Sequence, residues 1–285
     1  MWTDSGSTAR LPPLGSAAPP EQPLLHALFA GAAPIGLAFS PRGPQVIFSA
    51  QFSVSTQALL FVTDDRAPMR LAVFASGGGT NFQAILDAIE QGTLPATPVC
   101  CVSNTPEAGA LARAERHDVP THVVPPGEHD AAPSFGEALL DVLAAHDATF
   151  VALAGYMVKV PRAVVDAYRG RMTNVHPALL PAFGGQGMYG MHVHEAVIEY
   201  GVHWSGVTVH LVDEEYDHGP VVLQEPVPVY ADDTPEALAE RVKTVEHRLY
   251  PYALRLFAEG RVHLDGRTVR LDASERPPSS SLPDS

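Results

Sequence analysis

The chain has 285 residues, of which 46% are hydrophobic, and a formal net charge of −14 at pH 7. This length allows one large domain or two small ones. The acidic balance argues against nucleic acid or an anionic membrane surface as the main partner, because both require clustered Lys and Arg. The sequence contains no uninterrupted apolar run of about 18 residues, so it has no candidate membrane span. Its two cysteines, Cys100 and Cys101, are adjacent, which favours reduced thiols and a cytoplasmic location.

Residues 1–68 differ in composition from the rest of the chain. They hold nine of the 27 prolines and no lysine, and they show no sustained helical or strand periodicity. We therefore expect them to be disordered or loosely attached. A second interpretation is that the native chain starts at Met69 and that the residues before it are an unrelated extension. The Ser- and Pro-rich residues 269–285 are expected to form a disordered tail, which leaves one folded domain at 69–268.

From residue 69 onward, short apolar runs alternate with amphipathic segments. In chain order, the pattern predicts strands at 71–75, 98–102, 121–124, 150–153, 172–175, 207–212 and 221–229. It predicts helices after residue 81, from about 106 to 116, and at 134–145, 162–168 and 194–200, and a final helix that starts at about residue 235 and carries Leu238, Val242, Val245 and Leu249. Thr105 and Thr234, each followed by Pro-Glu, are the expected N-caps of two of these helices.

This alternation of strands and helices predicts an α/β fold. We expect a Rossmann-like, doubly wound, mainly parallel sheet with helices on both faces. In such sheets ligands bind beyond the carboxyl ends of the strands. The loops that directly follow strands are therefore the candidate functional segments, at 76–81, 103–106, 155–160, 174–190 and 213–219.

The first of these loops reads Ser-Gly-Gly-Gly-Thr-Asn and joins a strand to a helix N-terminus. Glycines let the backbone approach a ligand, and the helix dipole adds partial positive charge. The loop is therefore a candidate phosphate site, formed by Gly77, Gly78, Gly79, Thr80 and Asn81. A tight turn that merely needs glycine is the alternative. The loop lacks the Gly-Lys-Ser/Thr of a P-loop, and Phe82 stands where a dinucleotide fingerprint needs its third glycine.

Asn174 and His176 lie at the end of the strand predicted at 172–175, and they point to the same side because side chains alternate along a strand. An imidazole can move a proton at neutral pH, and an amide can donate to a developing oxyanion. Asp217 is a candidate partner, since a carboxylate near His176 would raise the pKa of that histidine. Each of the three could instead be an ordinary loop residue, and sequence alone does not bring them together.

Thirteen histidines, five of them between residues 192 and 218, raise the question of a metal. Their spacing matches no zinc motif, and His192-Val193-His194 is only a weak pair. We expect no metal.

Several segments, read in order, resemble a known family. They are SGGGTN at 76–81, SNTPEA at 103–108, LAGYM at 153–157, TNVHPALLPAFGG at 173–185, DEEYDHGPVVLQ at 213–224 and TVEHRLYP at 244–251. The chain is similar, over about residues 70–266, to the phosphoribosylglycinamide formyltransferase family. The resemblance implies transfer of the formyl group of 10-formyltetrahydrofolate, a co-substrate, to the amino group of 5-phosphoribosylglycinamide in de novo purine (IMP) biosynthesis. The expected partners are small molecules, without nucleic acid or membrane, and the expected assembly is a monomer or homodimer.

The resemblance also implies residue roles. Asn174 and protonated His176 would stabilise the oxyanion of a tetrahedral intermediate, and Asp217 would keep His176 protonated. The substrate phosphate would bind at the loop Gly77–Asn81, and Glu246 would contact the ribose or the glycinamide. The folate would bind at Met157, Val158, Lys159, Val160 and Asn174.

The sequence departs from the family pattern in three places. Val158-Lys159 follow Met157 where members often have Arg, the loop 125–134 holds no Arg, and the glycine-rich stretch 184–197 is longer than the common form. Four alternatives stay open: a formyltetrahydrofolate deformylase, another formyltransferase such as that of methionyl-tRNA, a non-catalytic nucleotide- or folate-binding module, and a metal-dependent hydrolase.

Overall fold

The computed structural model describes residues 68–128 and 132–272. The predictions for residues 1–67 and for the tail from residue 273 onward lie outside the described residues. Strand β9 (Thr268–Leu271) continues past the predicted domain limit of 268, so that limit is too early. It pairs with β8 (Val262–Asp265) in a short and largely exposed hairpin, which leaves little apolar periodicity for a sequence to reveal.

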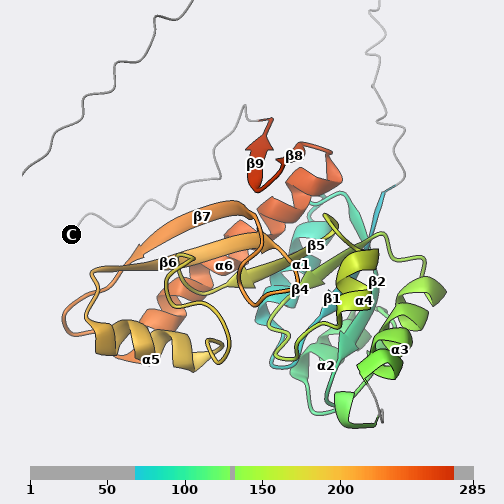
Figure 1. The fold of residues 1–285 in the computed structure, drawn as a ribbon, viewed down its shortest axis with the longest axis horizontal. Helices are drawn as coiled ribbons and strands as arrows, with labels where there is room; N and C mark the ends of the chain where they lie inside the picture. Colours follow the sequence, from blue (N-terminus) through green and yellow to red (C-terminus); the bar gives the residue numbers. More distant parts are fainter. Residues whose placement is uncertain (1–67, 129–131, 273–285) are drawn as a thin grey trace, which may run out of the picture. The chain divides into compact units, whose positions relative to one another are not determined.

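Within the described residues, seven strands form one sheet in the order β3-β2-β1-β4-β5-β6-β7 (Figure 1). Strands β1 to β5 run parallel, whereas β6 is antiparallel to β5 and β7 is antiparallel to β6. The bounds of β1 to β7 are Met69–Phe74, Ala96–Ser103, Thr121–Val123, Phe150–Leu153, Met172–His176, Trp204–Leu211 and Val221–Pro228. The predicted mainly parallel α/β sheet is confirmed.

Helices cover both faces of this sheet, as predicted (Figure 1). Helices α1 to α6 span Thr80–Glu90, Gly109–Arg116, Ala132–Ala145, Arg162–Ala167, Met191–Tyr200 and Pro235–Ala258. Strand β1 shows why both faces need a helical cover: its buried side chains are apolar and alternate between the two faces. Leu71 and Val73 lie in the core with α1, α2, α5 and α6, whereas Ala72 and Phe74 lie in the core with α3 and α4. None of the helices in the described ranges combines the length and the apolar character that crossing a membrane requires.

One predicted helix start is wrong, and with it the cap predicted at Thr105, while the cap predicted at Thr234 is confirmed. Helix α2 begins at Gly109 rather than near residue 106, because the Thr105 N–H bonds to the Ser103 hydroxyl at 3.2 Å and holds a turn there. Helix α6 continues through Pro251 to Ala258, since its last turns bury apolar side chains in the core. The Thr234 hydroxyl accepts from the Ala237 N–H at 3.2 Å, as its predicted capping role requires.

The strand order reverses between β1 and β4. The chain passes from β1 to β2 and β3 on one side, and then to β4 and β5 on the other. Doubly wound sheets bind ligands at this kind of switch point, beyond the carboxyl ends of the strands. The loops that follow β1 and β4 therefore flank the expected ligand position.

Replacing Phe74 with alanine tests the packing of the central strand. Phe74 has no exposed surface and its ring lies edge-on to Tyr156, with 5.2 Å between centroids. The cavity left by the change is expected to lower the free energy of unfolding by about 3–5 kcal/mol, measured by chemical denaturation. The matched control is Val123→Ala on the edge strand β3, where the side chain is 41% exposed and we expect a change within about 0.5 kcal/mol. Equal effects at both positions would contradict this account of the core.

Candidate active site

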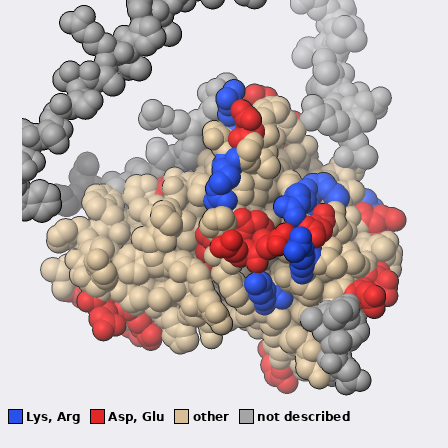
Figure 2. Space-filling view, viewed as in Figure 1, with Lys and Arg blue, Asp and Glu red and all other residues tan. Residues whose placement is uncertain are grey.

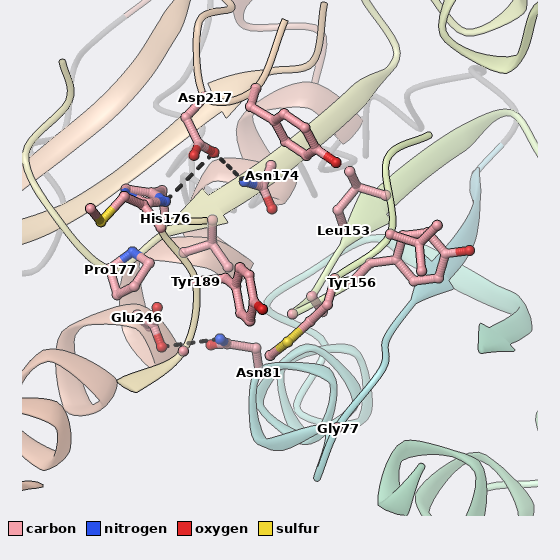
Figure 3. A pocket seen from close by; sticks show the side chains of 18 of the residues that line it. Gly77, Asn81, Leu153, Tyr156, Asn174, His176, Pro177, Tyr189, Asp217 and Glu246 are labelled. Carbon is pink, nitrogen blue, oxygen red and sulfur yellow. Dashed lines mark hydrogen bonds and ion pairs between the residues drawn. The ribbon is translucent and has the colours of Figure 1, made fainter. Parts of the chain in front are cut away.

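A cavity of about 720 Å³ lies at the switch point of the sheet (Figure 3). Its walls come from the loops after β1, β4, β5 and β6, from the glycine-rich stretch before α5 and from α6. Every residue that the sequence marked as a candidate lines it: Gly77, Gly78, Gly79, Thr80, Asn81, Met157, Val158, Lys159, Val160, Asn174, His176, Asp217 and Glu246. Residues from five distant segments are thus brought into one space.

Three polar side chains meet at the end of β5. The Asp217 carboxylate lies 3.5 Å from the His176 Nδ1 and 3.4 Å from the Asn174 Nδ2 (Figure 3). Asn174 and His176 line the cavity together, as the alternation of the strand predicted. The Gly185 N–H donates to the second carboxylate oxygen of Asp217 at 2.9 Å, which fixes the orientation of the carboxylate.

Asp217 reaches this cluster by a different path from the one predicted. Because β6 runs antiparallel to β5, Leu211 near its end pairs with Thr173 near the start of β5. The loop that follows β6 therefore leaves from the opposite edge and turns back along β5. Asp217 takes a left-handed backbone conformation, with φ of 52°, in this returning loop. Such a conformation is uncommon for residues other than glycine and often accompanies a constrained functional position.

His210 is a member of the cluster that sequence reasoning missed. Its Nε2 lies 3.1 Å from the Asn174 Nδ2, and its Nδ1 lies 2.9 Å from the Leu211 carbonyl oxygen. A carbonyl can only accept, so Nδ1 carries a proton, and Nε2 faces both the Asn174 amide and, at 3.7 Å, the Asp217 carboxylate. The side-chain orientation of Asn174 is thereby set. The signal is the strand register, in which Asn174 pairs with His210, and this pairing cannot be read from either segment alone.

Burial and charge oppose each other at this cluster. Burial raises the pKa of Asp217, but the imidazoles of His210 and His176 and the Gly185 N–H outweigh it, so the pKa lies below its ordinary value. Burial lowers the pKa of His176, and the nearby carboxylate of Asp217 only partly offsets this. Asp217 acts on His176 in the predicted direction, because its carboxylate favours the charged imidazole.

The two ring nitrogens of His176 have different partners. Nε2 lies 2.8 Å from the Phe183 carbonyl oxygen and donates to it, whereas Nδ1 faces Asp217. Protonation and deprotonation therefore take place at Nδ1. A proton on Nδ1 is favoured by the carboxylate and by any negative charge that forms nearby, which suits a group that takes up and releases protons during a reaction.

The glycine loop at the other end of the cavity leads into helix α1. Gly79 takes a left-handed conformation with φ of 70° at the N-cap, and no side chain caps the helix. Its free N-terminal N–H groups and the helix dipole favour an anion. At Gly77 and Gly78 a Cβ atom would meet nothing within 4 Å, so the open side of the loop is accessible to a ligand.

Glu246 on α6 faces the same loop. The Asn81 Nδ2 donates to its Oε2 at 3.1 Å (Figure 3). Burial raises the pKa of Glu246 to about 7, with Asn81 and Lys243 acting in the opposite direction. Glu246 therefore changes charge within the physiological range.

Both lysines of the chain line this cavity. The Lys159 ammonium lies 5.3 Å from the centre of the Tyr216 ring, a cation–π arrangement at the cavity wall. Lys243 lies one helical turn before Glu246 and pairs with Glu240. The sequence analysis assigned Lys159 to folate binding but missed Lys243, whose position depends on how α6 packs across the sheet. Periodicity on α6 does place Lys243 and Glu246 on one face.

The known proteins that resemble this chain share its domain. The formyl transferase family model matches residues 69–254. The phosphoribosylglycinamide formyltransferase of Escherichia coli K12 is 35% identical over 216 residues, which cover 76% of this chain and 100% of that protein. The chain belongs to the formyl transferase family.

Two further relatives extend this result. The chloroplastic phosphoribosylglycinamide formyltransferase of Arabidopsis thaliana is 42% identical over 68% of this chain and 66% of its own length. The crystal structure of glycinamide ribonucleotide transformylase 1 from Symbiobacterium toebii superposes with a TM-score of 0.68 and 41% identity, over 72% of this chain and 94% of that chain. The fold predicted from sequence is therefore the fold of this enzyme family.

The two histidines of the glycine-rich stretch 184–197 lie in different surroundings. His194 is buried and lines the cavity, and burial together with His176 and Lys243 lowers its pKa to about 4. His192 is exposed and packs against Tyr189, with 5.1 Å between ring centroids.

Among residues 68–128 and 132–272, no group of three or more His, Cys, Asp or Glu side chains is arranged to hold a metal ion.

Replacing Glu246 with glutamine is expected to change the pH dependence of stability. The raised pKa means that the folded protein holds a proton between about pH 4.5 and 7 that the unfolded chain has lost, so stability falls as pH rises through this window. Glutamine removes this loss, and urea denaturation at pH 8 should give a free energy of unfolding higher by about 3 kcal/mol, with little difference at pH 4.5. The control Glu195→Gln, exposed on α5, should change neither value. An unchanged pH dependence in the Glu246 variant would contradict the assignment.

Proposed function

We propose that this protein is a phosphoribosylglycinamide formyltransferase that transfers the formyl group of 10-formyltetrahydrofolate to the amino group of 5-phosphoribosylglycinamide in de novo purine biosynthesis. One observation carries the proposal. A single cavity holds the glycine loop Gly77–Asn81, which leads into the N-terminus of α1, at one end and the Asn174–His176–Asp217 cluster at the other. Membership of the formyl transferase family, together with relatives that carry this enzyme's name, supports the reaction and the substrate.

The chemistry begins with attack of the neutral substrate amine on the formyl carbon. A carbon–nitrogen bond forms and the formyl oxygen becomes an oxyanion. The Asn174 Nδ2 contacts the His210 Nε2 at 3.1 Å and the Asp217 Oδ1 at 3.4 Å, so its amide donates to that oxyanion by giving up the longer contact, the one with Asp217. The negative charge raises the proton affinity of His176, so the imidazole takes a proton at Nδ1 and stabilises the intermediate.

The intermediate collapses when the bond between the formyl carbon and the folate nitrogen breaks. The attacking nitrogen must lose one proton and the folate nitrogen must gain one, so the reaction needs one net proton transfer. His176 moves this proton at Nδ1, and Asp217, 3.5 Å away, favours the charged imidazole while the transfer takes place. Asp217 keeps its own charge because its pKa lies below the ordinary value.

The two ends of the cavity suit the two substrates. We assign the phosphate to the N–H groups of the loop Gly77–Asn81, and the ribose or glycinamide to Glu246. We assign the folate to the wall formed by Met157, Val158, Lys159 and Val160 and to Asn174. Lys159 is the one cationic residue among these four wall residues. We propose that its ammonium takes the role of the Arg that family members often carry near this position.

We propose small-molecule substrates as the partners of this protein. Figure 2 shows basic and acidic side chains interspersed on one face, without a continuous basic area. Arg162 pairs with Asp166 and Glu214, and Arg169 pairs with the same two acids. We propose a cytoplasmic monomer or homodimer, in keeping with Cys100 and Cys101, whose pKa values burial raises to about 12 and which are therefore unreactive thiols.

Incubation of the purified protein with both proposed substrates tests the function. We expect formylated glycinamide ribonucleotide and free tetrahydrofolate in equal amounts, measured by mass spectrometry and by folate absorbance. A deformylase would instead release formate without needing the amine. A folded protein that forms no formylated product would sink the proposal.

A further inference from the structure

Helix α2 contacts the glycine loop on the side that faces away from the cavity. The Ala110 N–H donates to the Gly77 carbonyl oxygen at 3.1 Å, and the Arg113 Nε donates to the Gly78 carbonyl oxygen at 2.7 Å. The approach is close, because a Cβ atom on Gly79 would lie 2.7 Å from the Cα of Ala110. Helix α2 itself contributes no residue to the cavity wall. Two consecutive carbonyl groups of the loop are therefore held by one helix.

Holding these carbonyls also sets the direction of the next two N–H groups. A trans peptide is planar, and its C=O and the following N–H point in opposite directions. With the carbonyls of Gly77 and Gly78 turned toward α2, the N–H groups of Gly78 and Gly79 turn away from it, to the side on which these residues line the cavity. Neither N–H donates to an acceptor within the described parts of the chain, so both are available to a ligand.

We propose that Arg113 is a positioning residue for the phosphate-binding loop. It does not line the cavity and acts through the peptide between Gly78 and Gly79. Its positive charge also polarises this peptide, which makes the Gly79 N–H a stronger donor. The inference rests on the proposed function in one respect, the assignment of a phosphate to this loop.

Arg113 is itself held from the outer side of the loop. Its Nη1 donates to the Gln83 Oε1 on α1 at 3.1 Å. The Gln83 Nε2 contacts the Asp87 Oδ1 at 2.8 Å and the His117 Nε2 at 3.1 Å, and the His117 Nδ1 lies 2.6 Å from Glu90. A half-buried guanidinium with partners on both the loop and α1 has a fixed place, which a positioning role requires.

The test uses Arg113→Ala, with Arg116→Ala, three residues further along α2 and exposed, as the matched control. We expect Arg113→Ala to raise the KM for glycinamide ribonucleotide by about 10-fold, because a charge-assisted hydrogen bond is lost. The kcat and the KM for 10-formyltetrahydrofolate should stay within about two-fold of the wild type, since the folate wall and the catalytic cluster do not contact Arg113. Arg113→Lys, whose ammonium can still donate to the Gly78 carbonyl, should restore most of the affinity.

Ribose 5-phosphate provides a second readout that needs no turnover. Its dissociation constant, measured by calorimetry, should rise by a similar factor in Arg113→Ala and stay unchanged in Arg116→Ala. If Arg113→Ala is unstable, Gln83→Ala carries the test. It removes the acceptor of the Arg113 Nη1, together with the contacts of Gln83 to Asp87 and His117, and should weaken ribose 5-phosphate binding by about three-fold.

The outcomes separate this inference from the proposed function. A wild-type protein that binds ribose 5-phosphate but makes no formylated product would end the proposed function, while a selective loss in Arg113→Ala would still support the inference. Unchanged binding in Arg113→Ala would overturn it, as would equal losses for phosphate and folate, or a wild-type protein that binds no ribose 5-phosphate.

Discussion

Replacing His176 with alanine is expected to reduce kcat by about 10²–10⁴-fold. The His176 imidazole can both accept and donate a proton near neutral pH, and its Nδ1 faces the Asp217 carboxylate in the wall of the cavity. Alanine leaves the amide of Asn174 and the substrate-binding walls in place, so the KM values should change much less than kcat. Steady-state kinetics with each substrate varied in turn measures this split.

The fold should survive the loss of His176. The side chain is 3% exposed, and its removal leaves the Phe183 carbonyl without its donor, at a cost of about 1–3 kcal/mol. Circular dichroism and thermal unfolding would separate this cost from the loss of activity. His203→Ala, an exposed histidine just before β6, is the control and should keep wild-type kinetics. Near-normal turnover in His176→Ala would mean that another group moves the proton.

Asp217→Asn is expected to lower kcat by about 10²–10³-fold and to shift its pH dependence. Asparagine keeps the shape and can still accept from the Gly185 N–H, so it removes the charge with little change in packing. The carboxylate raises the pKa of His176, and its loss lowers that pKa further below the ordinary value. The protonated fraction of His176 at a given pH therefore falls, and the decline of kcat toward high pH should begin at a lower pH.

A pH–rate profile from pH 5 to 9 distinguishes this effect from a loss of structure. The variant should recover part of its activity as pH falls, whereas a disordered site would not. Asp141→Asn, exposed on α3, is the control for removing one carboxylate and should leave the profile unchanged. A profile in Asp217→Asn that keeps its shape and only loses height would contradict the electrostatic role given to Asp217.

The sequence predicted the strands and the loops well because burial leaves a local signal. Alternating or continuous apolar residues reveal the strands, and glycines after the first strand reveal the loop that leads into α1. It could not reveal that β6 runs antiparallel to β5, because a buried strand has the same pattern in either direction. That reversal decides how Asp217 approaches His176.

The side chains that the sequence missed all depend on contacts between distant elements. His210 joins the cluster through the register of β5 with β6, and Lys243 reaches the cavity through the packing of α6. Arg113 lies on a helix whose predicted start was wrong, and its contact with Gly78 follows from the approach of α2 to the loop. Local periodicity holds no information on any of these contacts.

The placement of the lysines has a consequence for covalent labelling. Since the chain has only Lys159 and Lys243, all of its ε-amino groups lie in the wall of one cavity. Amine-acylating reagents usually modify lysines over the whole surface of a protein. In this chain they would modify the α-amino group of the first residue and, beyond that, only lysines in the active site. Each modification removes a positive charge where two anionic substrates are proposed to bind. Protection by either substrate would then report which end of the cavity it occupies.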